Sequence, residues 1–251
     1  MDDGRLGVLG GEVDAMLTRQ AAYATFAPTA AYVKHRRVLV EFMAQVVDEF
    51  GLTQATLHMA VNHVDRALSR FVICRTKWQL VAICAVLIAA KYAEPAGRVP
   101  SVSAFVLCAE GAYPQREVVQ MERSILVALS WNVRPPSILE FAAMYAEVSD
   151  LLSGRAHASR DLERRQTRLA RVALMHYEFN QWSASVVGAC VVQAARIMSD
   201  LPPVWASCSK HSRSDDLRRC VQLLFQVYKQ EYDGSPPSSP VSALDFAPDA
   251  A

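Results

Sequence analysis

Two pairs of opposite charges stand out in this sequence, one placed for recognition of a partner and the other for a structural role. In the first pair, Lys91 ends a long apolar stretch and Glu122 begins another, within the segment MERSILVAL. If both stretches are buried helices, both charges lie where those helices reach the surface. That placement suits recognition of a partner's backbone and side chains. Two ordinary solvated charges are the alternative, and periodicity alone leaves both interpretations open.

The second pair is Arg36 with Asp65. Asp65 lies between Val61 and Leu68, on the predicted apolar face of a helix. A buried carboxylate needs a partner, because an unpaired charge in the interior is very costly. The preceding helix begins with the basic cluster 34–37, and Arg36 is its candidate partner. An Asp65 exposed at a helix end is the alternative, and under either interpretation the residue is structural.

A run of arginines surrounds the start of a later predicted helix. Its members are Arg155, Arg160, Arg164, Arg165, Arg168 and Arg171. The ordinary interpretation of such a run is a solvated face, and the functional one is a site for an anion or an acidic partner. His63 is interpreted as a packed or surface histidine and not as a metal ligand.

Catalytic signatures are absent from the sequence. It contains no GxxxxGK, GxGxxG, HExxH or GxSxG motif. Its six cysteines include no CxxC pair and no metal-ligand spacing. We therefore expect no catalytic residue, no metal and no cofactor in this chain.

Composition narrows the class of protein. The 251 residues are 52% hydrophobic, which excludes overall disorder, and the formal net charge of +1 does not indicate wholesale binding of nucleic acid. The cysteine pattern and an N-terminus without a signal-peptide pattern favour a reduced, intracellular protein.

The element that organises the rest is the stretch Trp78–Tyr92, which has no charged residue from Leu80 to Ala90. A helix that is apolar all round belongs in the middle of a core. It is too short for a membrane span, which needs about 20 apolar residues. A second such stretch, Val186–Met198, matches 80–92 at four of thirteen positions. Two central helices indicate a duplicated helical domain.

Helical periodicity, caps and breakers predict an all-α chain of two tandem five-helix domains with an additional N-terminal helix. The predicted helices are 12–23, 34–50, 53–70, 78–92, 101–109, 114–129, 137–152, 161–180, 186–198, a short piece near Val204, and 215–232. Residues 1–11 are glycine-rich and expected to be loose. The predicted divisions are 1–33 for the N-terminal segment and helix, 34–134 and 135–232 for the two domains, and 233–251 for a disordered tail.

The segments HRRVLVEFMAQVVDEFGLTQATLHMAVNHVDRALS, KWQLVAICAVLIAAKYAE and MERSILVALSWNV, in this order, closely resemble the cyclin box. The resemblance covers roughly residues 12–145, and the second half resembles the weaker C-terminal cyclin fold. The short length and the mixed A-like and D-like character are similar to those of a herpesvirus-encoded cyclin.

The resemblance implies an activating subunit of a cyclin-dependent kinase, with the catalytic chemistry supplied by the kinase. Such a subunit packs on the kinase's regulatory helix, holds it inward and lets the activation loop reorganise. The implied kinase-binding residues are Lys91, Tyr92, Glu94, Glu122 and Leu126, although Ala93 replaces an acidic residue that is usual there. The family's buried arginine–aspartate pair matches Arg36 and Asp65.

The family's substrate-docking groove is only partly matched. Where docking cyclins carry Met-Arg-Ala-Ile-Leu followed by tryptophan, this chain has residues 35–39, HRRVL, and then Phe42. The candidate groove consists of Val38, Leu39, Phe42, Gln79 and Glu49. Gln45 replaces the acidic residue expected to meet a basic side chain of the docking motif, which puts such docking in doubt.

The implied partner is therefore a kinase, and we expect the chain in the nucleus, with the cytoplasm as a second compartment, and without direct contact to nucleic acid or a membrane. One alternative is a two-repeat helical transcription factor of the TFIIB type, which shares the fold. It needs a basic face and usually a zinc ribbon, and neither is evident in the sequence. A helical enzyme is a third possibility, which no motif supports.

Overall fold

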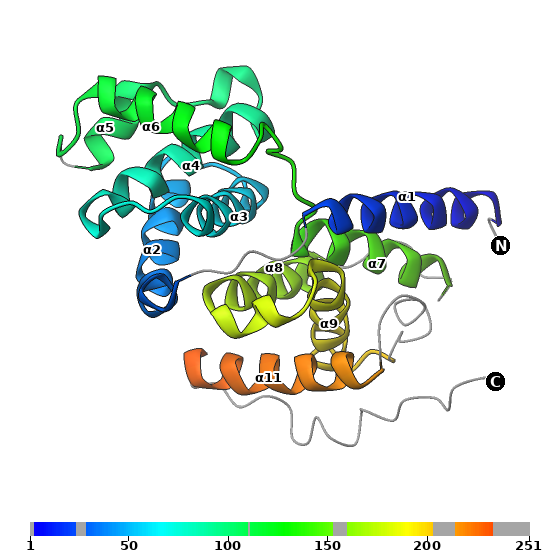
Figure 1. Ribbon diagram of the computed structural model, residues 1–251. Helices are drawn as coiled ribbons and strands as arrows, with labels where there is room; N and C mark the ends of the chain where they lie inside the picture. Colours follow the sequence, from blue (N-terminus) through cyan, green and yellow to red (C-terminus); the bar gives the residue numbers. More distant parts are fainter. Residues whose placement is uncertain (1–2, 24–28, 110, 153–159, 203–213, 233–251) are drawn as a thin grey trace. The chain divides into compact units, whose positions relative to one another are not determined.

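The computed structural model describes residues 3–23, 29–109, 111–152, 160–202 and 214–232, and these are all helical or irregular, with no strand among them (Figure 1). The chain divides into two compact units between Pro135 and Pro136, and residues 1–22 belong to the C-terminal unit. The all-α class and the tandem arrangement predicted from the sequence are confirmed. The expected loop 153–159, with Arg155, the piece near Val204 and the tail 233–251 lie outside the described residues.

The N-terminal unit is built around one helix, α4. Its helices are α2 (Ala30–Glu49), α3 (Gln54–Arg70), α4 (Trp78–Ala93), α5 (Val102–Cys108) and α6 (Gln115–Ala128), with the short 3-10 helices η1 (Arg75–Lys77) and η2 (Ala96–Arg98). Every residue of α4 from Leu80 to Ala90 is buried, and α2, α3, α5 and α6 all pack against it. Its central place follows from its sequence, which is apolar on all sides.

Only when η1 is added does this helix reach the length and composition of a membrane span, because α4 alone has 16 residues. The stretch Arg75–Ala93 is the one such candidate within the described ranges, and 67% of its apolar window is buried inside the protein. Because most of this stretch is buried by other helices of the same unit, it has the burial expected of the core helix of a globular domain.

Side-chain caps fix where the helices begin. Thr53 accepts a hydrogen bond from the Thr56 N–H at the start of α3, and Ser101 accepts one from Ala104 at the start of α5. Thr29 does the same for α2, which begins four residues before the predicted Lys34. Gly51 ends α2 with a φ of 61°, as expected for a glycine stop.

The C-terminal unit is built around α9. It contains α1 (Asp3–Ala22), α7 (Ile138–Leu152), α8 (Arg160–Met175), the 3-10 helix η3 (Tyr177–Gln181), α9 (Ala184–Ile197) and α11 (Ser214–Tyr232). Helices α7, α8 and α11 pack against α9, and α1 packs against α7. Nearly all of α9 is buried, so the second apolar stretch has the core position predicted for it.

Two further predicted boundaries were wrong. The expectation of a loose segment 1–11 fails because α1 is helical from Asp3, with Leu9, Val13 and Met16 buried at helical spacing. The predicted helix 161–180 ends at Met175, where the extended backbone of His176 lets η3 turn Phe179 into the core.

Gly188 in α9 marks the closest approach of two helices. A Cβ added there would lie 2.7 Å from the Phe141 Cβ and 3.0 Å from the Ile138 backbone oxygen, both on α7. Gly188→Ala should therefore lower the free energy of unfolding by about 1–3 kcal/mol, the usual cost of overpacking. Chemical denaturation measures the change.

Gly10→Ala is the matched control, because this glycine is also inside a helix but has nothing within 4 Å of the added Cβ. Removing a glycine from an open helix position should raise stability by about 0.5–1 kcal/mol. Equal effects at Gly188 and Gly10 would contradict the close contact between α7 and α9.

Candidate partner-binding surface

Lys91 and Glu122 are brought together by the packing of α4 against α6. The Lys91 Nζ lies 2.5 Å from the Glu122 Oε1. The lysine side chain is 46% exposed and the glutamate side chain 13%. The sequence predicts both charges where their helices reach the surface, which holds for Lys91, whereas most of the Glu122 side chain is buried. The Lys91 ammonium group is therefore accessible to a partner, and the mostly buried Glu122 carboxylate holds it in place through the ion pair.

Apolar side chains surround this ion pair. Tyr92 is half-exposed, and Leu126, one helical turn beyond Glu122, is partly exposed. Val119 lies one turn before Glu122 on the same side of α6 and is also half-exposed. Sequence reasoning missed Val119, although its spacing of three from Glu122 and seven from Leu126 could have identified it. A paired charge within exposed apolar side chains is a surface suited to a protein partner.

Glu94 faces inward and does not belong to this exposed surface. Its Oε1 accepts hydrogen bonds from the Thr53 N–H, the Thr53 hydroxyl and the Thr56 hydroxyl. Burial raises the pKa of Glu94, but these hydrogen bonds outweigh it and leave the pKa below its ordinary value. The geometry thus gives Glu94 a structural role at the start of α3, and its proposed contact with a partner stays a prediction.

Arg36 and Asp65 form a fully buried ion pair between α2 and α3. The Arg36 Nε donates to the Asp65 Oδ1 at 2.8 Å, and its Nη2 donates to the Oδ2 at 2.9 Å. The two side chains are 2% and 4% exposed. Tyr32 also donates its hydroxyl to Asp65, and burial together with the Asp65 charge raises the tyrosine pKa well above its ordinary value. The pairing expected from the sequence is therefore present, with a third member that the sequence did not reveal.

The residues of the candidate docking groove lie on α2 and at the start of α4. Val38 is exposed, Leu39 and Phe42 are half-buried, and Gln79 and Glu49 are exposed. Apolar and polar side chains of this set are thus both accessible from solvent. Peptide docking at these residues stays a prediction.

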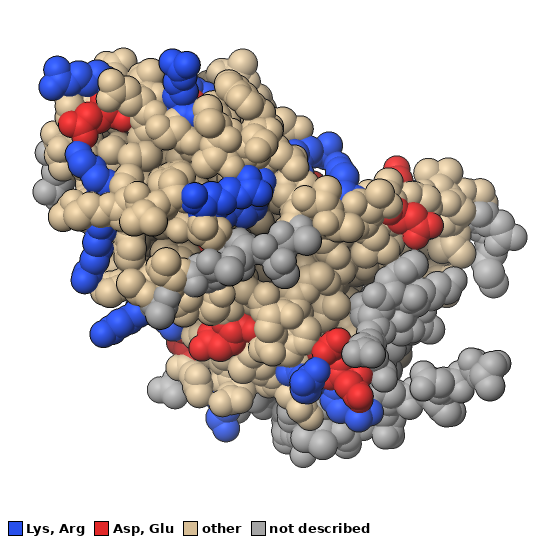
Figure 2. Space-filling view, in the orientation of Figure 1, with Lys and Arg blue, Asp and Glu red and all other residues tan. Residues whose placement is uncertain are grey.

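His63 is a packed histidine. It is fully buried in α3, and its Nε2 is 2.8 Å from the Val133 oxygen. Burial lowers the pKa of His63 to about 4, so the ring is neutral at neutral pH and donates to that carbonyl. No group of three or more potential metal ligands occurs within the described ranges. On the face that Figure 2 shows, lysine and arginine side chains lie in separate groups, several of them beside acidic side chains, and form no continuous basic patch there.

Two family descriptions match successive parts of this chain. The cyclin N-terminal domain matches residues 13–134, and the cyclin C-terminal domain matches residues 136–239. Cyclin-B1-1 of Arabidopsis thaliana is 33% identical over 213 residues, which are 82% of this chain and 47% of that protein. Cyclin-A3-1 of Oryza sativa subsp. japonica is 32% identical over 221 residues, or 86% and 58%. The chain thus spans about half the length of the curated relatives it matches.

Solved structures with the same fold include one from a virus and one from a yeast kinase complex. A viral cyclin from herpesvirus saimiri superposes with a TM-score of 0.73 at 16% identity, covering 87% of this chain and 97% of that one. A chain of the yeast RNA Pol II CTD kinase CTDK-1 complex gives 0.63 at 14% identity, covering 91% and 78%. At these identities the likeness concerns the fold alone. The matches to both family domains, over 13–134 and 136–239, place this chain in the cyclin family.

Proposed function

We propose that this chain is the regulatory subunit of a cyclin-dependent kinase, which it binds and activates. The observation that carries the proposal is the ion pair of Lys91 with Glu122 at the rim of the buried helices α4 and α6, beside the exposed ring of Tyr92. Cyclins are regulatory subunits of kinases, and this chain has no catalytic motif of its own. The chemistry in the complex is therefore the kinase's.

The mechanism follows from what a rigid helical surface can do for a mobile partner. The rim of α4 and α6 packs on the kinase's regulatory helix and holds it inward. That position completes the kinase's Lys–Glu ion pair, and the activation loop reorganises around the substrate site. In thermodynamic terms, the chain binds the active kinase conformation more tightly than the inactive one and shifts the population toward it.

A pull-down followed by a kinase assay tests this proposal. The purified chain should retain at least one member of a panel of cyclin-dependent kinases and increase its phosphorylation of a histone-type substrate. A chain that retains no kinase but binds duplex DNA in a gel-shift experiment would support a TFIIB-like factor in its place.

We further propose that the chain acts inside the cell, in the nucleus and with the cytoplasm as a second compartment, to promote cell-cycle progression. The sequence relatives that support a role in the cell cycle include the G2/mitotic-specific cyclin-A of Patella vulgata, which is 32% identical over 195 residues, or 77% of this chain and 44% of that protein. A herpesvirus origin stays a prediction that rests on the sequence resemblance.

Peptide docking at the groove of Val38, Leu39 and Phe42 should be weak and dominated by apolar contacts. Gln45 is exposed on α2 and carries no charge to hold a basic residue of the docking motif. Replacing the leucine of such a peptide should abolish most binding, whereas replacing the basic residue should change affinity by less than about threefold. Calorimetric titration of matched peptides measures both, and a large loss on removing the basic residue would count against this expectation.

A further inference from the structure

Three arginines make one exposed side of α8. Arg160, Arg164 and Arg168 follow each other at intervals of four, so they lie within about 80° of each other around the helix and span about 12 Å along it. All three are exposed, and we call them the arginine face. Arg164 has an ion pair with Asp161 at 3.4 Å, in which both side chains are more than three-quarters exposed. Such a pair contributes little stability, so another anion can replace Asp161, and the three arginines together with Asp161 still carry a net positive charge.

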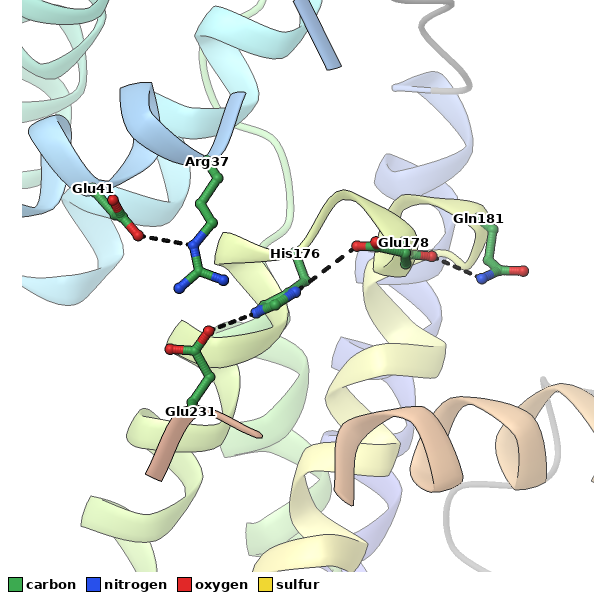
Figure 3. Close-up of polar contacts among 6 residues, drawn as sticks. All are labelled: Arg37, Glu41, His176, Glu178, Gln181 and Glu231. Atoms are coloured by element: carbon green, nitrogen blue, oxygen red, sulfur yellow. Dashed lines mark hydrogen bonds and ion pairs between the residues drawn. The ribbon is translucent and has the colours of Figure 1, made fainter. Parts of the chain in front are cut away.

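The end of α11 is held against the same helix. The ring of Tyr232, the last residue of α11, lies beneath the Arg168 guanidinium at 5.5 Å. His176 follows α8 directly, and its Nε2 is 3.0 Å from the Glu231 Oε1 (Figure 3). The Nδ1 of the same ring is 3.9 Å from the Glu178 Oε2. The chain therefore leaves its last described helix beside the arginine face.

The residues that follow Tyr232 have the opposite charge. The sequence 233–251, DGSPPSSPVSALDFAPDAA, contains three aspartates and no lysine, arginine or histidine. Ser235 and Ser239 each precede a proline, which favours extended backbone at the serine. An extended chain reaches about 10 Å from Tyr232 to Ser235, and the two serines are then about 13 Å apart. The separation of the two serines therefore matches the length of the arginine face, which is roughly 12 Å.

We propose that the arginine face is the docking site of this chain's own segment 233–251 when Ser235 and Ser239 carry phosphate. Each phosphate adds about 1.5–2 negative charges and oxygens that arginine binds in a bidentate manner. Without phosphate, the three aspartates give only a weak, screened attraction. The docked segment lies along α8 with one phosphate near Arg168 and the other near Arg160.

The phosphoryl groups come from ATP through a protein serine kinase. The serine Oγ forms a bond to the γ-phosphorus, the bond from that phosphorus to the bridging oxygen of ADP breaks, and the hydroxyl proton leaves to the kinase's base. The docking does not depend on which kinase performs this transfer, so it stands apart from the function proposed above.

A binding experiment in trans tests the site without any kinase. A fluorescent peptide of residues 231–245, phosphorylated at Ser235 and Ser239, is titrated with the full unphosphorylated chain and followed by anisotropy. We expect it to bind at least about tenfold more tightly than the unphosphorylated peptide, and the gain should fall steeply with added salt. Equal affinity of the two peptides would overturn the proposal.

The variant Arg160→Ala with Arg164→Ala should weaken phosphopeptide binding about tenfold while leaving the Arg168–Tyr232 contact in place. Arg116→Ala with Arg123→Ala is the matched control, since it removes two exposed arginines from α6 and the same charge. Equal losses in the two variants would mean that only net charge matters and would contradict the proposed site. In a competition experiment, a short RNA or anionic vesicles that displace the labelled phosphopeptide as well as unlabelled phosphopeptide does would overturn the proposed occupant.

The arrangement in cis has its own readout. A full chain carrying phosphoserine at 235 and 239 should bind the labelled phosphopeptide at least about tenfold more weakly than the unphosphorylated chain, because its own segment occupies the arginine face at high effective concentration. Undiminished binding by the phosphorylated chain would overturn docking within the molecule.

Discussion

Asp65→Ala should lower the free energy of unfolding by about 3–5 kcal/mol, the expected cost of breaking a buried ion pair. The substitution leaves the Arg36 guanidinium in the interior without the carboxylate that holds it at 2.8 and 2.9 Å. It also removes the acceptor of the Tyr32 hydroxyl. Two buried donors thus lose one acceptor, and neither can reach water without opening the contact between α2 and α3. Urea denaturation of the purified variant measures the loss.

Glu41→Ala is the matched control for this prediction. Glu41 pairs with Arg37 at 2.9 Å on the same helix, one residue from Arg36, but these two side chains are 47% and 44% exposed. An exposed pair of this kind contributes about 0.3–0.5 kcal/mol. If Asp65→Ala and Glu41→Ala had similar midpoints, the buried pair would have no special weight in the stability of this unit.

The ion pair also illustrates what the sequence could predict and what it could not. The sequence predicts the buried position of Asp65 because a carboxylate between Val61 and Leu68 on an apolar face needs a partner, and the basic cluster at the start of the preceding helix offers Arg36. Tyr32 was missed because α2 was predicted to begin at Lys34. The structure shows that Thr29 caps α2, so the helix begins at Ala30. A single threonine is equally consistent with a loop, so the sequence alone does not identify this cap.

Tertiary packing explains the errors at the ends of helices. The glycines of α1 disfavour a helix on propensity alone, but Leu9, Val13 and Met16 bury one side of it. Burial of three side chains outweighs that propensity, because each contributes about 1.5–3 kcal/mol and each glycine costs about 1. Within the same unit, α8 ends after Met175 because Phe179 is buried in the core. No local sequence pattern predicts that burial.

The candidate surface was predictable in part. A charge that ends an apolar helix must lie near the surface, so the positions of Lys91 and Glu122 at a rim followed from the sequence. How deeply each side chain lies did not follow, because it depends on how α6 is rotated against α4. Glu94 shows the same limit: its carboxylate turns toward Thr53 and Thr56, which are 41 and 38 residues away in the chain.

Lys91→Ala combined with Glu122→Ala should abolish most binding and activation of the kinase. Interfaces depend on a few central side chains, and truncating one costs about 2 kcal/mol or more, which is roughly a 30-fold loss of affinity. Removing both members leaves neither charge unpaired in the free protein. Because Glu122 is only 13% exposed, we expect a small decrease in stability of about 1 kcal/mol, with the helical spectrum unchanged. Affinity for a panel of cyclin-dependent kinases and phosphorylation of a histone-type substrate measure the effect.

The chain provides a matched control for this variant beside the same two helices. Lys77, next to the start of α4, pairs with Glu117 of α6 at 2.6 Å, and these side chains are 40% and 33% exposed. Lys77→Ala with Glu117→Ala therefore removes the same two residue types from the opposite end of α4, at a similar cost in stability. If the assigned surface is correct, this control keeps its kinase affinity while the variant at Lys91 and Glu122 loses it. Should both variants bind and activate as well as the parent, the kinase must contact another part of the chain. Should both lose binding equally, the packing of α4 against α6, and not the rim at Lys91, would be what the kinase requires.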